Sequence, residues 1–237
     1  MREIVFCESP EDVADAAADL IHHSQTVAIT ERGVFRIALS GGQTPKILYN
    51  QLAHVDWKDE MQWEKWEVFW SDERAIPTDS DESNYHMVRK ALLSRVPVGE
   101  VWRMRGEAAD LSEAADEYAR TIKSRFGPGS PVFDVILLGM GTDGHTASLF
   151  PGHPAIESGA LVEAVEVNHP LPRRLTLTLR VLNSARRVVF LVNGESKAQC
   201  VHDVLVKEDY HLPATRVMPH EGDCWWLLDH AAASLIR

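Results

Sequence analysis

A glycine-rich segment in the second half of the chain carries an acid and an imidazole: Gly139-Met140-Gly141-Thr142-Asp143-Gly144-His145. A histidine, with an unperturbed pKa of about 6.5, can take a proton from water at neutral pH, and a neighbouring carboxylate can fix its tautomer. The alternative is a loop that is glycine-rich for packing, with a histidine that caps a helix. Because the apolar run from Val132 to Leu138 leads directly into the segment, we favour acid–base chemistry with His145 and Asp143 as the titratable pair.

A second candidate is the segment from Ser40 to Pro45, which reads Ser-Gly-Gly-Gln-Thr-Pro. Gly41 and Gly42 let the backbone approach a ligand closely, while Ser40 and Thr44 supply hydroxyl groups. Pro45 suits the first turn of a helix, whose N-terminal dipole favours an anion. These residues form a candidate phosphate site. On this segment alone, a plain strand-to-helix turn with a threonine cap stays open as the alternative.

The segment Ser71-Asp72-Glu73-Arg74 follows a short aromatic run and places three charges at the end of an expected strand. Such charges are costly to bury unless they are paired or bound to something. The guanidinium fork of Arg74 suits a phosphate or a developing oxyanion, and Asp72 or Glu73 could hold it in place. A solvated loop with a surface ion pair is the simpler alternative for this segment in isolation.

Further basic candidates come from the last third of the chain. Lys197 ends the segment Asn193-Gly194-Glu195-Ser196-Lys197, which opens an expected helix. A cation in a first helical turn opposes the helix dipole, so the position suggests that Lys197 serves an anion, with a solvated lysine as the alternative. Arg173 and Arg174 precede a strand-like run in which threonines alternate, and the pattern does not fix their direction.

Apolar runs of strand length alternate with amphipathic stretches of helix length, which predicts βα units around a mostly parallel sheet. In such sheets ligands bind beyond the carboxyl ends of the strands, where all four candidate segments lie. The threonine alternation of the run at 175–179 predicts one polar face and an antiparallel part of the sheet. The expected strands are Phe35–Leu39, Glu67–Trp70, Val101–Met104, Val132–Leu138, Leu161–Val167, Leu175–Leu179, Val188–Val192 and Cys224–Leu228, and the expected helices are Glu11–His23, Pro45–Ala53, Ser83–Arg95, Ser112–Phe126, Glu195–Val206 and His230–Ile236.

The predicted fold class is therefore α/β: a mostly parallel, Rossmann-like twisted sheet with helices on both faces and some antiparallel strands in the C-terminal half. No linker, low-complexity tract or internal repeat divides the 237 residues, so we expect one domain spanning residues 1–237. The three cysteines, Cys7, Cys200 and Cys224, lack zinc or disulfide spacing, and we expect reduced thiols and a cytoplasmic protein. No apolar run has the length of a signal peptide or a membrane span.

The net charge of −11 argues against non-specific binding to nucleic acid or to an anionic membrane. An anionic substrate would need a local basic pocket, which makes a convergent group of basic side chains informative. The histidines outside the glycine-rich segment lack metal-ligand spacing, and neither a metal nor another cofactor is expected. His153 and His169 lie nearer the candidate site than the others, without an assigned role.

Four motifs occur in order along the chain: Leu39-Ser-Gly-Gly-Gln-Thr-Pro45, Trp70-Ser-Asp-Glu-Arg74 followed by Ser83-Asn84-Tyr85, Gly139-Met-Gly-Thr-Asp-Gly-His-Thr-Ala-Ser-Leu-Phe-Pro151, and Gly194-Glu-Ser-Lys197. Together they resemble the 6-phosphogluconolactonase family over nearly the whole chain, and the third motif is highly specific. Gln43 departs from the smaller residue that members often have there, which we expect to leave phosphate binding intact.

The resemblance implies hydrolysis of 6-phospho-D-glucono-1,5-lactone to 6-phospho-D-gluconate in the pentose phosphate pathway, without an organic cofactor. It implies His145 as the general base that activates water, with Asp143 as its orienter. Arg74 would bind either the oxyanion or the phosphate. Ser40, Gly41, Gly42, Thr44, Lys197 and Arg174 are the expected phosphate-binding residues. The expected partner is thus a small sugar phosphate, and a monomer is favoured.

The same fold is shared by glucosamine-6-phosphate deaminases, which have similar Ser-Gly-Gly-x-Thr-Pro and Gly-x-Asp-Gly-His segments. Deaminase-like chains continue after the histidine with an Asn-Glu-Pro segment, whereas this chain reads Ser148-Leu149-Phe150-Pro151. A deaminase and isomerase, with Asp72 as proton shuttle, is the alternative enzyme. A non-catalytic sugar-phosphate sensor is the alternative from another class, disfavoured by the acidic charge and the lack of a basic helix-turn-helix segment.

Overall fold

A seven-stranded sheet forms the centre of the protein, and the computed structural model describes residues 1–237. The strand order is β1-β10-β9-β6-β2-β3-β5, and every neighbouring pair is parallel. The strands span Arg2–Cys7 (β1), Phe35–Leu39 (β2), Trp66–Trp70 (β3), Glu100–Val101 (β5), Val135–Leu138 (β6), Arg187–Val192 (β9) and Asp223–Asp229 (β10). Because all seven run the same way, their carboxyl ends share one edge of the sheet.

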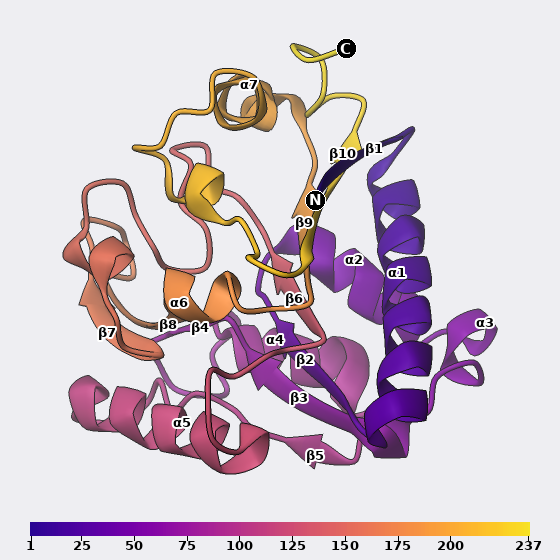
Figure 1. Cartoon of the computed structure of the whole chain (residues 1–237), viewed down its shortest axis with the longest axis vertical. Helices are drawn as coiled ribbons and strands as arrows, with labels where there is room; N and C mark the ends of the chain where they lie inside the picture. The colour runs from indigo at the N-terminus through magenta and orange to yellow at the C-terminus, as the bar shows by residue number, and fades with distance from the viewer.

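Helices cover both faces of this sheet, which confirms the predicted fold class. Figure 1 shows α1 and α2 on one side, with α5 and α6 on the other. The helices span Pro10–Arg32 (α1), Gln43–Leu52 (α2), Val55–Lys58 (α3), Asn84–Val88 (α4), Leu111–Phe126 (α5), Leu179–Leu182 (α6) and Ala198–Leu205 (α7). A π-helical turn at Arg89–Leu93 (η2) continues α4, and 3-10 turns lie at Trp63–Lys65 (η1), Pro154–Glu157 (η3), Glu195–Lys197 (η4) and Pro213–Arg216 (η5).

A second, antiparallel sheet has the order β4-β8-β7 and spans Asp72–Arg74, Arg173–Leu177 and Val162–Glu166. The predicted antiparallel pair is therefore confirmed, and the polar segment after β3 becomes its third strand. The predicted polar face of β8 faces the protein interior. Thr176 and Thr178 are fully buried, and their hydroxyls are satisfied there by donating to the backbone oxygens of Leu177 and Ala160.

Helix α1 runs nine residues beyond the predicted end at His23, to Arg32. The polar residues that suggested an end are satisfied within the helix: the hydroxyl groups of Ser24 and Thr26 donate to carbonyls one turn earlier. Gly33 then ends the helix with φ 75° and an N–H that bonds the oxygen of Ile29.

Several other boundaries differ from the prediction. The expected closing helix at 230–236 is wrong; this segment forms successive turns, and the Asp229 carboxylate accepts the N–H of Ala232. Strand β1 was not predicted, and β5 keeps only the start of the expected strand at 101–104. Near the N-terminal end of β6, the buried Asp134 accepts the backbone N–H of Arg36, so this carboxylate replaces part of the strand pairing.

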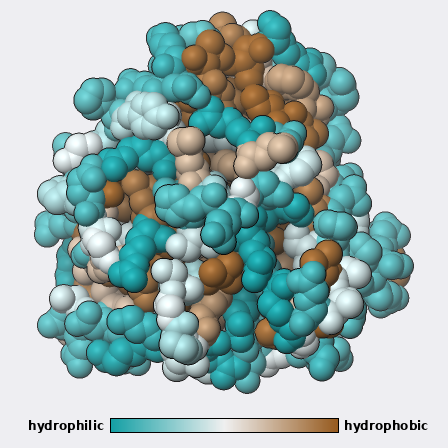
Figure 2. Space-filling model, in the orientation of Figure 1, coloured by the Kyte–Doolittle hydropathy of each residue, from teal (hydrophilic) through white to brown (hydrophobic).

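One hydrophobic cluster of 66 buried residues extends through both sheets. Its largest side chains include Trp66, Trp70 and Trp226. On the face drawn in Figure 2, hydrophilic residues cover most of the surface, and apolar residues gather mainly at the top, near the place where Figure 1 draws α7. No helix combines the length and the apolar character needed to cross a membrane.

Candidate active site

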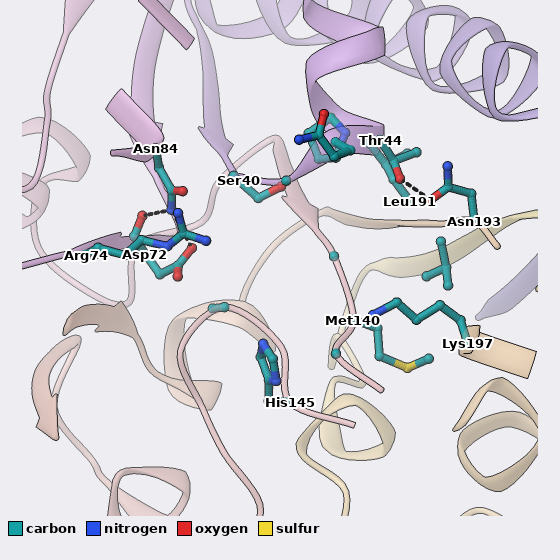
Figure 3. Close-up of a pocket in the computed structure, with 18 of the residues that line it drawn as sticks. Ser40, Thr44, Asp72, Arg74, Asn84, Met140, His145, Leu191, Asn193 and Lys197 are labelled. Carbon is teal, nitrogen blue, oxygen red and sulfur yellow. Dashed lines mark hydrogen bonds between the residues drawn. The ribbon is translucent and has the colours of Figure 1, made fainter. Parts of the chain in front are cut away.

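A cavity of about 350 Å³ opens beyond the carboxyl ends of β2, β3, β6 and β9. The loops after these four strands are the four segments singled out in the sequence, and Figure 3 shows their side chains converging on one space. Residues 40–45 and 139–141 form much of the lining. The remaining lining residues are Asp72, Arg74, Asn84, His145, Ala147, Arg174, Leu191, Val192, Asn193 and Lys197.

His145 lines this cavity and is held by its expected partner. Its Nδ1 lies 2.6 Å from Oδ1 of Asp143, and its ring stacks on Phe150 with centroids 4.2 Å apart. The hydrogen bond to His145 lowers the pKa of Asp143 to about 2, so this carboxylate is ionised at neutral pH. An ionised carboxylate can only accept, which puts the proton on Nδ1 and leaves a lone pair on Nε2. Nε2 is therefore the ring nitrogen of His145 that is left without a proton in this arrangement.

The loop from Gly139 reaches this arrangement because two glycines allow it. A methyl group on Gly141 would lie 2.1 Å from His145 Nδ1 and 2.5 Å from Asp143 Oδ1. Gly144 has φ 79°, where a side chain is strained, and a methyl group there would also meet Leu212. Beyond the histidine, Ala147 keeps φ 48° at the cavity wall, and this is uncommon for a residue with a side chain.

The segment after β2 lines the opposite side of the cavity. Helix α2 has no side-chain cap, so the N–H groups of its first turn have no capping acceptor inside the protein. The Ser40 side chain is buried and its Oγ has no partner. Thr44 differs from the expected role as a donor, because its hydroxyl donates to Asn193 Oδ1 at 2.6 Å. Backbone groups and Ser40 therefore supply the free donors.

Strand β4 separates the three charges of its segment into different roles. Glu73 accepts hydrogen bonds from the backbone of Asn84 and Tyr85 and from the Ser83 hydroxyl. Glu73 thus satisfies the free N–H groups at the start of α4. Desolvation raises the pKa of Glu73, although these hydrogen bonds act to lower it. The idea that Glu73 holds the guanidinium of Arg74 is wrong, because the helix start takes both carboxylate oxygens.

Asp72 does not pair with Arg74 either. Its carboxylate accepts from Ser148 Oγ at 2.7 Å and from Asn84 Nδ2 at 3.2 Å. Arg74 instead donates through Nη1 to the backbone oxygen of Glu82, and its Nε is buried without a partner. The guanidinium of Arg74 therefore faces the cavity with donor capacity to spare.

Two more cations line the cavity. Arg174 is only 3% exposed and forms no salt bridge, although burial costs its charge and lowers its pKa. Desolvation likewise lowers the pKa of Lys197, whose ammonium group has no hydrogen-bond partner in the protein. Arg173 lies outside this cavity and is exposed. The cavity is therefore locally basic, although the protein is acidic. Its lining contains three cations and one carboxylate: Arg74, Arg174, Lys197 and Asp72.

Three polar or sulfur-containing lining residues lie inside the quoted segments and motifs but had no predicted role: Asn84, Met140 and Asn193. Asn84 comes from α4, twelve positions after Asp72, and belongs to the second motif, which gave it no role in the cavity. It approaches so closely that a methyl group on Gly41 would lie 1.8 Å from its Oδ1. Asn193 stands directly after β9, where the rule of strand ends places ligand-binding residues, and opens the segment that Lys197 ends. No group of three or more His, Cys, Asp and Glu side chains is placed to hold a metal ion.

A parallel sheet with glycine-rich loops, an uncapped helix start and a basic cavity at its carboxyl edge defines an α/β protein built to bind a small anion at that edge. The family model for glucosamine-6-phosphate isomerases and 6-phosphogluconolactonase matches residues 8–226. The chain belongs to this family.

Individual relatives agree with the family assignment. The 6-phosphogluconolactonase of Homo sapiens is 39% identical over 236 residues, which cover 96% of this chain and 91% of the human protein. The structure of 6-phosphogluconolactonase from Trypanosoma brucei matches with a TM-score of 0.86 and 29% identity, covering 100% of this chain and 99% of that one. The structure of the enzyme of the same name from Thermotoga maritima gives 0.84 and 30%, covering 97% and 100%.

Proposed function

We propose that the protein hydrolyses 6-phospho-D-glucono-1,5-lactone to 6-phospho-D-gluconate. The observation that carries the proposal is a single cavity lined by His145, which is hydrogen-bonded to Asp143, and by three basic side chains. The names of the relatives support this substrate, and the motif after His145 separates the chain from the deaminases of the same family.

The first step is attack of water on the lactone carbonyl carbon. Nε2 of His145 takes a proton from the water as the new carbon–oxygen bond forms, and the carbonyl oxygen becomes an oxyanion. Asp143 holds the proton on Nδ1 and stabilises the imidazolium that results. The tetrahedral intermediate then breaks its bond to the ring oxygen, which receives the proton from His145. The product is an open-chain acid that ionises at neutral pH and releases one proton to solvent.

The cations divide between the two negative ends of the reacting substrate. Lys197, Ser40 and the first turn of α2 lie on loops that suit a phosphate, since they combine a charge with free donors. Arg174 adds a second cation from β8, the central strand of the small sheet. Arg74 is the candidate donor to the oxyanion, because only Nη1 of its guanidinium has a partner in the protein and a charged donor strengthens its bond as charge develops.

The test is acid release from freshly prepared lactone, measured against spontaneous hydrolysis. Replacement of His145 by Ala is expected to lower kcat about 10² to 10⁴-fold, because general-base assistance is lost. His54→Ala is a matched control, since His54 is exposed at the start of α3 and lines no part of the cavity. Wild-type rates in His145→Ala, with unchanged circular dichroism, would overturn the mechanism.

Deamination of glucosamine 6-phosphate is the rival activity within the same family. Asp72 lines the cavity and would have to move a carbon-bound proton in that reaction. Both of its oxygens accept hydrogen bonds, from Ser148 and Asn84, and these bonds favour a fixed carboxylate. Ammonia release from glucosamine 6-phosphate, together with no acid release above the spontaneous rate, would decide for the deaminase.

A further inference from the structure

His169 lies outside the four motifs, on the loop between β7 and β8, and contacts the cavity through Arg174. Its Nδ1 is 2.7 Å from Nη2 of the guanidinium. Arginine has donors and no acceptor, so Nδ1 must carry the lone pair and the ring proton must be on Nε2. The contact therefore exists only while His169 is neutral.

The other bonds of Arg174 leave its outer nitrogens weakly held. Nε donates to the backbone oxygen of Leu171 at 3.0 Å, and Nη1 lies 3.5 Å from Ser148 Oγ. The guanidinium lies over the ring of Phe150, 5.3 Å from its centroid, and that ring also stacks on His145. His169 thus supplies the short hydrogen bond to the end of the fork.

A neutral partner has a particular advantage for a buried cation that must bind an anion. A carboxylate would neutralise Arg174 and compete with the substrate for its donors. An imidazole fixes the guanidinium without cancelling its charge, and the other outer nitrogen keeps only the long contact to Ser148 Oγ. The cation stays oriented and keeps donors for an incoming oxygen.

The geometry points to His169 as a positioning residue that holds Arg174 for the anionic substrate only in its neutral form, so that substrate affinity falls when His169 is protonated. This inference rests on the proposed function for its substrate. It predicts a pH dependence of KM that is separate from the titration of the catalytic base His145.

The charges around His169 set the direction of its titration. Desolvation is the largest cause and Arg174 the next, and both lower its pKa from the ordinary value of 6.5. His145 and Arg74 act in the same direction, while Asp143 opposes them. The neutral, hydrogen-bonded form is therefore present at neutral pH and is lost only under acidic conditions.

Two substitutions test this inference in the full-length protein. In His169→Gln the side-chain oxygen can accept the same hydrogen bond and does not titrate. We expect its KM at pH 7.5 to stay within about twofold of wild type, whereas His169→Ala raises KM about five- to tenfold with little change in kcat. The substrate phosphate titrates in both proteins, so its effect on KM is shared. We therefore expect the KM of wild type at pH 5 to rise at least about threefold more than that of His169→Gln.

A spectroscopic measurement separates failure of this inference from failure of the proposed function. Long-range ¹H–¹⁵N spectra of the wild type are expected to show the Nε2–H tautomer of His169, and binding of inorganic phosphate is expected to weaken in His169→Ala. These two results do not require lactone hydrolysis. A proton on Nδ1, or equal pH profiles of KM in wild type and His169→Gln, would overturn the role of His169.

Discussion

Lys197 is a half-buried cation that finds no partner inside the protein. Its replacement by Ala is expected to raise KM about 10- to 100-fold, because a charged hydrogen bond to the substrate contributes about 1.5–3 kcal/mol. The value of kcat should change much less, since the lysine lies away from the carbonyl in the proposed arrangement. Steady-state kinetics of lactone hydrolysis measure both constants.

Lys207→Ala is the matched control for this prediction. Lys207 follows α7, the helix that begins directly after Lys197. It is exposed and pairs with Asp203 one turn earlier. An equal rise of KM in both variants would mean that the net charge, and not a contact in the cavity, determines substrate affinity.

At the level of single residues, the rule that ligands bind at strand ends predicted which loops line the cavity. It did not predict which side chains hydrogen-bond to one another there. Ser40, Arg74, Arg174, Lys197 and His145 all line one space, and their catalytic and binding roles stay predictions. The partners inside the protein were less predictable. Glu73 is next to Arg74 in sequence but does not pair with it, because the carboxylate accepts hydrogen bonds from the N–H groups at the start of α4.

The loop that joins β6 to the small sheet depends on a glycine for the contact between imidazole and carboxylate. Gly141→Ala is expected to lower kcat about 100-fold, because the added methyl group would displace His145 and Asp143. The pH-independent rate of acid release measures this loss. Gly159→Ala is the control, since a methyl group there meets nothing within 4 Å.

This prediction concerns geometry and not the presence of the catalytic groups. Crystallography of Gly141→Ala should find the His145 ring moved away from Asp143, with the fold unchanged. A wild-type kcat in this variant would show that the hydrogen bond between the two side chains is dispensable.

Element types were largely predictable, while element ends were not. Hydrophobic periodicity predicted α5 and the buried strands, since burial repeats along each of them. The end of α1 depends on where hydroxyl groups find acceptors, and the C-terminal turns depend on a carboxylate at the end of β10. The ends of these elements therefore depend on hydrogen bonds of particular side chains, which a hydrophobic pattern does not reveal.

For the whole molecule, a buried hydrogen-bonded cluster around Gln25 and Trp66 lies at the end of β3 opposite to the cavity. Gln25 of α1 is fully buried, accepts from Trp66 Nε1 and Gln62 N, and donates to the oxygen of Glu60. Gln25→Ala is expected to lower the free energy of unfolding by about 3 kcal/mol, because it leaves a cavity and an unpaired indole N–H. Urea denaturation measures this change.

The same variant should keep KM within about twofold of wild type, since Trp66 begins β3 and the cavity lies beyond the other end of that strand. Gln62→Ala is the control for stability, because the Gln62 side chain is exposed. A large rise of KM in Gln25→Ala, measured on folded protein, would contradict this separation of stability from binding.

The order of strands could not be read from the sequence, although the α/β class could. Alternation of strands and helices predicts parallel pairing, but it does not say that β6 lies between β2 and β9. That placement matters for the site, because it brings the His145 loop between the loop of Ser40 and that of Lys197. The four motifs are therefore neighbours in space in an order that differs from their order along the chain.

The pairing of β1 with β10 has a consequence for biosynthesis. Strand β1 has no other neighbour in the sheet, and its register matches Arg2 to Cys224 and Cys7 to Asp229. During synthesis β1 therefore waits for its only partner until more than two hundred further residues have emerged. During that interval Ile4 and Phe6 expose an unpaired strand edge to other nascent chains and to chaperones. Closure of the sheet is thus a late, long-range event in the folding of this protein.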